Sequence, residues 1–195
     1  MKETAADGKP ILAFKDKIAW TKWLEKNHAA STGLWLRLAK KGTGITSVSR
    51  SDALDVALCY GWIDGQASGE NDEYWLQKFT PRAKRSMWSK RNREHVARHI
   101  ASGEMRPAGL AEIERARADG RWDAAYDGPK NMPVPDDLAA ALNRNRKASV
   151  FFDSLDSRNR FAILFRIHQA KRAETRERRI AQFVEMLERS EKLHS

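Results

Sequence analysis

The sequence predicts an α+β protein in which a small antiparallel sheet packed with helices precedes an all-helical C-terminal part. Three observations support this class. Segments of alternating apolar residues lie between glycine-containing turns in the first half of the chain. Helical spacing of apolar residues replaces that pattern after Pro135. The 195 residues are 41% hydrophobic and include seven tryptophans and seven phenylalanines, enough for one large core or two small ones.

The first elements follow from local capping and periodicity. Asp16–Asn27 reads as a helix whose first residue can act as the N-cap. Leu34–Leu38 alternates with period two, as expected of a strand with one buried face. Ser51 or Asp52 is expected to cap the next helix, and Gly61 is well placed at its C′ position.

Two strands joined by a hairpin loop are expected next. They cover Trp62–Gln66 and Glu73–Phe79, and Pro81 stops the second because proline cannot donate to a sheet ladder. Ser89 starts a helix that reaches about residue 101. Pro107 at a first helical position starts another, which Gly120 ends.

The C-terminal part reads as four helices. The acids Asp136 and Asp137 favour the start of the first of these helices, and Asp156 is expected to cap the third. The last carries apolar residues at the i, i+3, i+4, i+7 spacing: Ile180, Phe183, Val184 and Leu187. We therefore place a boundary near Lys130, with an α+β domain over residues 1–130 that holds the candidate site and a helical domain over residues 131–195.

The net charge of +10 is concentrated in one segment. Residues 1–77 hold ten basic and ten acidic side chains, and residues 94–195 hold nineteen basic and sixteen acidic ones. Lys78–Arg93, called the basic segment below, holds seven basic side chains and no acid. A local field of this kind predicts an anionic partner.

The basic segment and the strand before it predict a binding site. Arg82, Lys90 and Arg91 would supply positive charge. Ser89 and the free backbone N–H groups of the helix start would supply hydrogen bonds. Aromatic walls, an acid and an amide complete the candidate site: Tyr60, Trp62, Asp64, Gln66, Trp75 and Trp88. The alternative is a solvated loop whose charges pair with nearby acids, beside a Trp62 that belongs to the core.

Neither catalytic residues nor a metal or cofactor site is predicted. Cys59 at a helix end reads as a buried apolar residue with no adjacent cation or histidine to activate it. His95 and His99 share a helix face, but the glutamate of the zinc-protease motif and a third ligand are missing. One cysteine and a polar N-terminus predict a cytoplasmic protein, and no apolar run approaches a membrane span.

One block of sequence, Leu54–Gly65, contains Tyr-Gly-Trp-Ile-Asp-Gly and is quite specific as a family marker. Further blocks accompany it: Phe79–Arg82, Trp88–Lys90, Gly120–Tyr126, Pro135–Leu138, Phe151–Phe152, Ala170–Lys171 and Glu174–Arg176. Together they resemble the YdeI/OmpD-associated family, also called bacteriocin-protection proteins, over about residues 14–190. The resemblance implies a cytosolic bacterial protein with an α+β domain and a helical C-terminal domain. It also implies a loose link to tolerance of bacteriocins, antimicrobial peptides or envelope stress.

The sequence therefore predicts a non-catalytic protein that binds a small anionic ligand or an acidic protein partner. One alternative is an enzyme acting on a small anionic metabolite in the same pocket, with Asp64 or Tyr60 in proton transfer. Another is nucleic-acid binding along the basic segment, against which the neutral residues 1–77 and the missing recognition motif count. The sequence gives neither the ligand's identity nor the oligomeric state.

Overall fold

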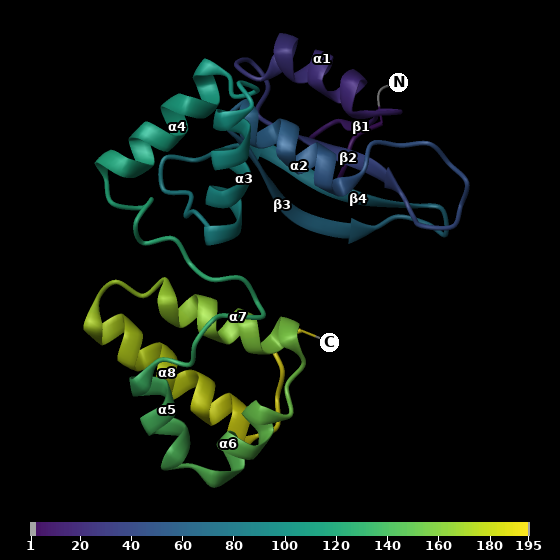
Figure 1. The fold of residues 1–195 in the computed structure, drawn as a ribbon. Coiled ribbons are helices and arrows are strands. Elements are labelled where there is room, and N and C mark those ends of the chain that lie inside the picture. The colour runs from purple at the N-terminus through teal and green to yellow at the C-terminus, as the bar shows by residue number, and fades with distance from the viewer. Residues whose placement is uncertain (1–2, 195) are drawn as a thin grey trace. The chain divides into compact units, whose positions relative to one another are not determined.

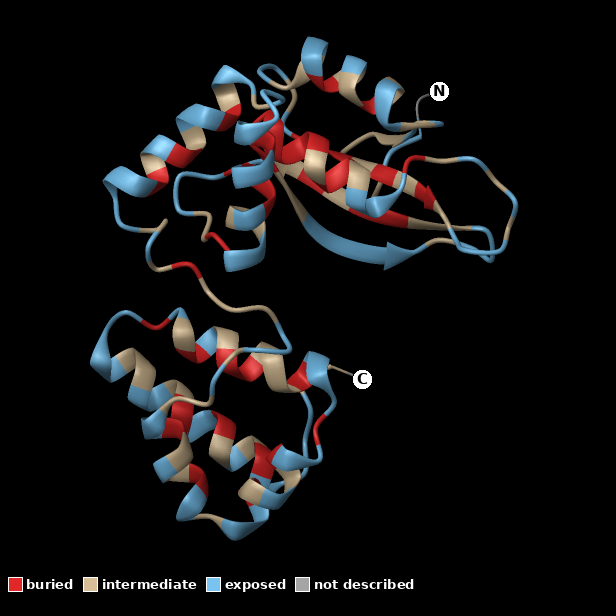
Figure 2. Cartoon of the chain, viewed as in Figure 1, coloured by how far each residue is buried: buried red, intermediate tan, exposed pale blue. Residues whose placement is uncertain are grey.

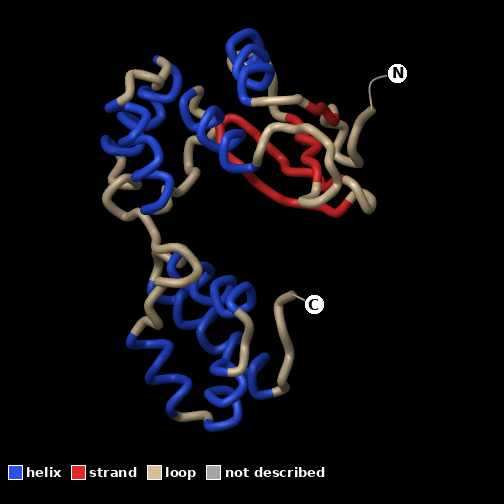
Figure 3. The backbone as a smooth tube through the Cα atoms, turned by 45° about the vertical axis from the view of Figure 1, so that its right-hand side comes forward, coloured by secondary structure: helices blue, strands red, loops and turns tan. Residues whose placement is uncertain are grey.

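The computed structural model describes residues 3–194, which divide into two compact units. Residues 3–88 and 92–124 form one, called the N-terminal unit, and residues 89–91 and 125–194 form the other, called the C-terminal unit. The predicted boundary near Lys130 lies inside the second. Among the described residues, strands occur in the N-terminal unit and the C-terminal unit is helical, which confirms the α+β class (Figures 1 and 3).

The N-terminal unit is built on a four-stranded sheet of order β1-β2-β4-β3. β1 (Ile11–Ala13) runs parallel to β2 (Leu34–Ala39). β4 (Tyr74–Pro81) pairs antiparallel with β2 on one side and with β3 (Trp62–Gly69) on the other. The predicted antiparallel sheet thus has an additional parallel strand at its edge. Three residues are too few to show a period-two pattern, which is why the sequence did not indicate β1.

Two helices, α1 (Lys17–Asn27) and α2 (Arg50–Cys59), cover one face of this sheet. Figure 2 shows that both helices and the sheet carry buried residues. The side chains that pack between them are almost entirely apolar or aromatic. They include Trp20, Leu24, Leu34, Leu36, Leu38, Ala53, Ala57, Trp62 and Phe79. The leucines of β2 lie on one face of the strand, as their alternation predicted.

The N-cap of α1 is the residue predicted from the sequence, whereas the N-cap of α2 is a different one. The carboxylate of Asp16 accepts a hydrogen bond from the N–H of Ala19 at 2.7 Å, so it caps α1 as predicted. α2 is capped by Ser49, whose hydroxyl accepts from the N–H of Asp52 at 3.1 Å. The predicted caps, Ser51 and Asp52, lie inside the helix, because an earlier hydroxyl already satisfies its free amides.

The alternation predicted for the Trp62–Gln66 strand is wrong beyond Asp64. A β-bulge shifts the pairing with β4 between Asp64 and Ala67. A bulge inserts one extra residue, so Ala67 rather than Gln66 continues the face that Asp64 begins. Buried Gln77 on β4 stabilises the bulge by donating from Nε2 to the carbonyl oxygen of Gln66 at 3.0 Å.

Two further helices follow, α3 (Lys90–Ala101) and α4 (Pro107–Ala118). α4 packs closely against the end of α2 through Gly109. A Cβ atom at this position would overlap the carbonyl oxygen of Cys59 and lie 2.7 Å from the Cε of Met105. The close approach of two backbones therefore depends on the missing side chain.

The C-terminal unit consists of α5 (Asp136–Asn143), α6 (Arg146–Asp153), α7 (Ser157–His168) and α8 (Ala173–Glu188). Asp156 caps α7 as predicted, accepting from the N–H of Asn159 at 2.8 Å. Apolar side chains of all four helices form one core, including Leu138, Leu142, Phe152, Ile163, Leu164, Ile167, Ile180, Phe183 and Leu187. Within residues 3–194, no helix combines the length and apolar character that crossing a membrane requires.

Replacing Gly109 with Ala tests the contact between α2 and α4. Alanine favours a helix interior, but the added methyl group must push the helices apart, so we expect a net destabilisation of about 1–3 kcal/mol. Urea unfolding followed by tryptophan fluorescence measures it, since all seven tryptophans lie in the N-terminal unit. Gly69→Ala is the control, because its Cβ would meet open space. Equal stability of the two variants would contradict the close packing.

Candidate functional site

Two cations of the basic segment form ion pairs with different partners. Lys78 Nζ lies 2.6 Å from Asp7 in the N-terminal unit. Lys90 Nζ lies 2.7 Å from Asp127 in the C-terminal unit. Neither acid belongs to the hairpin formed by β3 and β4. Two of the seven cations of the basic segment are therefore paired with acids of the protein.

Arg82 is a buried cation that is held by contacts within the protein. Its side chain is only 5% exposed, and its guanidinium carbon lies 3.6 Å from the ring centroid of Trp88. Its Nη1 donates to the carbonyl oxygen of Met87 at 3.2 Å. The guanidinium also acts on half-buried Glu112, whose pKa is raised by desolvation in spite of Arg115, Arg82 and Arg121. A cation stacked on a ring and surrounded by protein presents little of its charge to a ligand.

The start of α3 is already occupied by the protein's own backbone. Ser89 is buried and pairs as a parallel bridge with Tyr126. The N–H of Lys90 donates to the carbonyl oxygen of Tyr126 at 2.9 Å. Arg91, by contrast, is exposed. One of the amides predicted to hold an anion is thus engaged, so this helix start is less open to a ligand than the sequence suggested.

The predicted aromatic walls form part of the core. Trp62 is 1% exposed, and its Nε1 donates to the carbonyl oxygen of His28 at 3.1 Å. Tyr60 is 5% exposed, and half-buried Trp75 packs against the same cluster. These rings pack against other side chains of the core, which agrees with the alternative that Trp62 is a core residue.

The two polar residues predicted beside them lie elsewhere. Asp64 pairs with Arg50 at 2.7 Å, and Gln66 is exposed within the bulge. Of the ten predicted site residues, only Tyr60 lines a cavity described below. Anion binding by the others stays a prediction.

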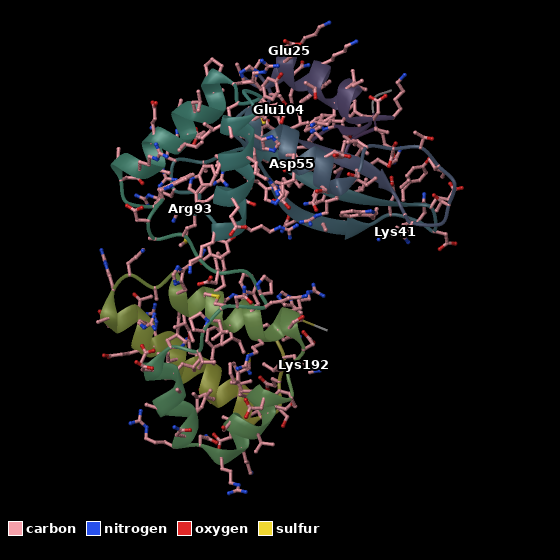
Figure 4. All side chains as sticks on the ribbon, viewed as in Figure 1. Glu25, Lys41, Asp55, Arg93, Glu104 and Lys192 are labelled. Atoms are coloured by element: carbon pink, nitrogen blue, oxygen red, sulfur yellow. The ribbon has the colours of Figure 1, made fainter. Side chains whose placement is uncertain are left out.

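A cluster of histidines and carboxylates in the N-terminal unit was not predicted as a site. Asp55 on α2 forms a short hydrogen bond with Nδ1 of His95 and lies 3.3 Å from Nε2 of His99. His99 Nδ1 lies 2.6 Å from an oxygen of Glu104, which follows α3. Both histidines are buried. Figure 4 labels the two acids on their elements. The i, i+4 spacing of the histidines was visible in the sequence, but their partner forty residues away was not.

The cluster fixes the charge of its acids. Burial acts to raise the pKa of Asp55, but hydrogen bonds from His95 and His99 outweigh it and leave that pKa lowered. The hydrogen bond from His99 lowers the pKa of Glu104. Both carboxylates therefore remain ionised at neutral pH. Among the described residues, no group of three or more His, Cys, Asp or Glu side chains is placed to hold a metal ion.

A larger hollow lies in the C-terminal unit, between α5 and α8. Its volume is about 660 Å³, within the range of ligand pockets. On α8 the lining residues follow the spacing of one helix face: Ala173, Arg176, Glu177, Ile180, Ala181, Val184, Glu185 and Glu188. On α5 the residues are Asp137 and Ala141, followed by Arg144 just beyond the helix. We call this hollow the α5–α8 groove.

The groove has an apolar floor and a charged rim. Ala141, Ala181 and Val184 lie on the floor, and the two alanines are small enough to leave it open. The rim holds four acids and two bases: Asp137, Glu177, Glu185, Glu188, Arg144 and Arg176. Arg176 pairs with Asp137, with Nη2 2.9 Å from Oδ1. The rim therefore carries an excess of two negative charges in a chain of net charge +10.

Two family models match the chain. Residues 12–112, just over half of it, match a domain of unknown function, DUF8412. The chain belongs to this family. Residues 131–190 match the family described as bacteriocin-protection, YdeI or OmpD-associated, which confirms the resemblance. Every residue lining the α5–α8 groove lies within residues 131–190, the segment that matches this second family model. No curated protein and no solved structure matches the chain.

Replacing Arg82 with Ala distinguishes a structural cation from a ligand-binding one. Loss of the contacts with Trp88 and Met87 is expected to destabilise the N-terminal unit by about 1–3 kcal/mol. The matched control is Arg91→Ala, which removes an exposed charge and should change stability by less than about 0.5 kcal/mol. Urea unfolding followed by tryptophan fluorescence measures both. An Arg82→Ala protein as stable as wild type would contradict the structural assignment.

Replacing Asp55 with Asn should weaken the unit in a pH-dependent way. A carboxyl group whose pKa is lowered by folding stabilises the protein above its ordinary pKa, and that contribution is lost as pH falls through the folded value. At pH 7 we expect the variant to be less stable by about 1–3 kcal/mol. The difference from wild type should shrink as pH falls below about 4. Urea unfolding at several pH values checks this, and a difference independent of pH would contradict it.

Proposed function

We propose that this protein is a non-catalytic binding protein whose α5–α8 groove takes a basic amphipathic helix of a peptide or protein partner. The observation that carries the proposal is the groove itself. It combines a volume of about 660 Å³, an apolar floor and an acidic rim within a strongly basic chain.

The floor suits a helix rather than a small molecule. α5 and α8 present parts of one face each, and small side chains at Ala141, Ala173 and Ala181 leave room for a third helix to approach. Recognition of this type places apolar residues of the incoming helix, spaced i, i+3, i+4 and i+7, into a groove between two helices. Ile180 and Val184 offer the apolar contacts.

The rim suits a basic partner. Glu177 and Glu188 are exposed at positions eleven residues apart on α8, so they can face charges along the length of a bound helix. Asp137 is paired with Arg176 and Glu185 with Arg189, which leaves Glu177 and Glu188 against Arg144, an excess of one negative charge. Charge complementarity of this kind raises the association rate and disfavours acidic partners.

The family description agrees with a peptide ligand. The groove lies in the segment that matches bacteriocin-protection proteins, and bacteriocins are antibacterial peptides or proteins. A protein that sequesters a basic amphipathic peptide would protect a cell by lowering the free concentration of that peptide. This mechanism requires binding but no reaction.

A designed peptide tests the proposal. It has about 16 residues, the length of α8, with leucines on one face and lysines on the other. Fluorescence anisotropy with the labelled peptide measures the affinity for the full-length protein. Ala181→Trp should fill the groove, and Glu177→Lys should reverse part of its charge. Each is expected to weaken binding about tenfold or more, which corresponds to about 1.4 kcal/mol.

The control is Glu174→Lys, which makes the same charge change on an exposed position of α8 that does not line the groove. An acidic peptide with the same apolar face tests the acidic partner predicted from the sequence. Equal loss of binding in Glu174→Lys and Glu177→Lys, or tighter binding of the acidic peptide, would contradict the proposal.

A further inference from the structure

A small cavity lies in the N-terminal unit, lined by α1, α2, α3 and the segment leading into α4. Its volume is about 80 Å³, roughly that of two or three water molecules in the liquid. Its polar and charged lining residues include Lys17, Asp55, Tyr60, His99, Glu104 and Arg106. Lys17, Glu104 and Arg106 are exposed, whereas Tyr60 and His99 are buried, so two cations and one carboxylate stand on the exposed side of the cavity.

Both carboxylates of this cavity already contact donors of the protein. Asp55 lies 3.3 Å from Nε2 of His99, and Glu104 lies 2.6 Å from its Nδ1. The second oxygen of Glu104 lies 3.6 Å from Nζ of Lys17. Both ring nitrogens of His99 thus face carboxylates. The acids therefore leave little negative charge for a ligand to meet.

The remaining groups favour an anion. The guanidinium carbon of Arg106 lies 6.0 Å from the ring centroid of Tyr60, and the Tyr60 hydroxyl helps to raise the pKa of Arg106. Burial raises the pKa of Cys59 to about 11, so its thiol is neutral at pH 7. The hydroxyl of Tyr60 is buried without a hydrogen-bond partner among the described residues, and a bound oxyanion would accept a hydrogen bond from it.

We infer that this cavity binds a small oxyanion, the carboxylate or phosphate group of a metabolite, held by Lys17 and Arg106 above the ring of Tyr60. Charge-assisted hydrogen bonds from an arginine and a lysine are the usual means of holding such groups. The size of the cavity admits the charged group alone, so the remainder of a larger ligand would project toward solvent. This cavity shares no residue with the α5–α8 groove, so binding of an oxyanion here does not depend on binding of a peptide there.

Titration of the full-length protein with acetate and with inorganic phosphate tests the inference. Backbone amide shifts of Tyr60 and Arg106, followed by NMR up to about 10 mM of each probe, should saturate for at least one of them. Arg106→Ala and Lys17→Ala are each expected to weaken that binding about tenfold or more. Arg106→Lys should recover part of the loss, since it restores the charge without the fork.

The matched control is Lys41→Ala, which removes an exposed cation at the far end of the sheet from Asp55 and Glu104 (Figure 4). It should leave the affinity unchanged, and tryptophan fluorescence verifies that every variant is folded. Saturation by acetate alone identifies a carboxylate site, and saturation by phosphate alone a phosphate site. Absence of saturable shifts with both probes, or equal weakening by Lys41→Ala, would overturn the inference.

Discussion

Burial of one face of α8 is the constraint on which the groove depends. Ile180, Phe183 and Leu187 are held in the core of the C-terminal unit, which fixes the rotation of the helix. Once that face is inward, the neighbouring face with Ala181 and Val184 must lie beside α5. The groove is open because small side chains stand where larger ones would close it. Two helices that pack against the core on one face and leave a groove between their neighbouring faces can receive a third helix in that groove.

In the N-terminal unit, most of the charge that looked available for a ligand contributes to the fold. Lys78 pairs with an acid near the start of the chain, and Arg82 is stacked on Trp88 inside the protein. Asp55 joins α2 to two histidines of α3. The contacts of Lys78 and Asp55 connect segments far apart in sequence, and the stacking of Arg82 buries a charge within one loop. The exposed cations that line the small cavity, Lys17 and Arg106, lie outside the basic segment and were not predicted to bind a ligand.

How far the sequence predicts the structure depends on the range of the interaction involved. Capping by Asp16 and Asp156 and the alternation of β2 are local, and the sequence predicted them. The bulge after Asp64 was missed, because a period-two pattern cannot reveal an extra residue that a partner strand accommodates. β1 was missed because its pairing with β2 is the main sign of its existence.

The candidate site was less predictable for the same reason. Concentration of charge in residues 78–93 is a property of the sequence, but whether those charges face a ligand depends on partners such as Asp7 and Asp127. The groove depends on two helices more than thirty residues apart and on what is absent between them. Small side chains at Ala141 and Ala181 give no signal until the helices are placed side by side.

The most direct test of the account is to locate the basic peptide on the protein. Amide spectra of the isotope-labelled full-length chain, recorded with increasing peptide, report every residue that the peptide affects. The account predicts that the largest shifts fall on α5 and α8, around Ala141, Ala181 and Val184. Shifts confined to residues 78–93, or no shifts at all, would contradict it.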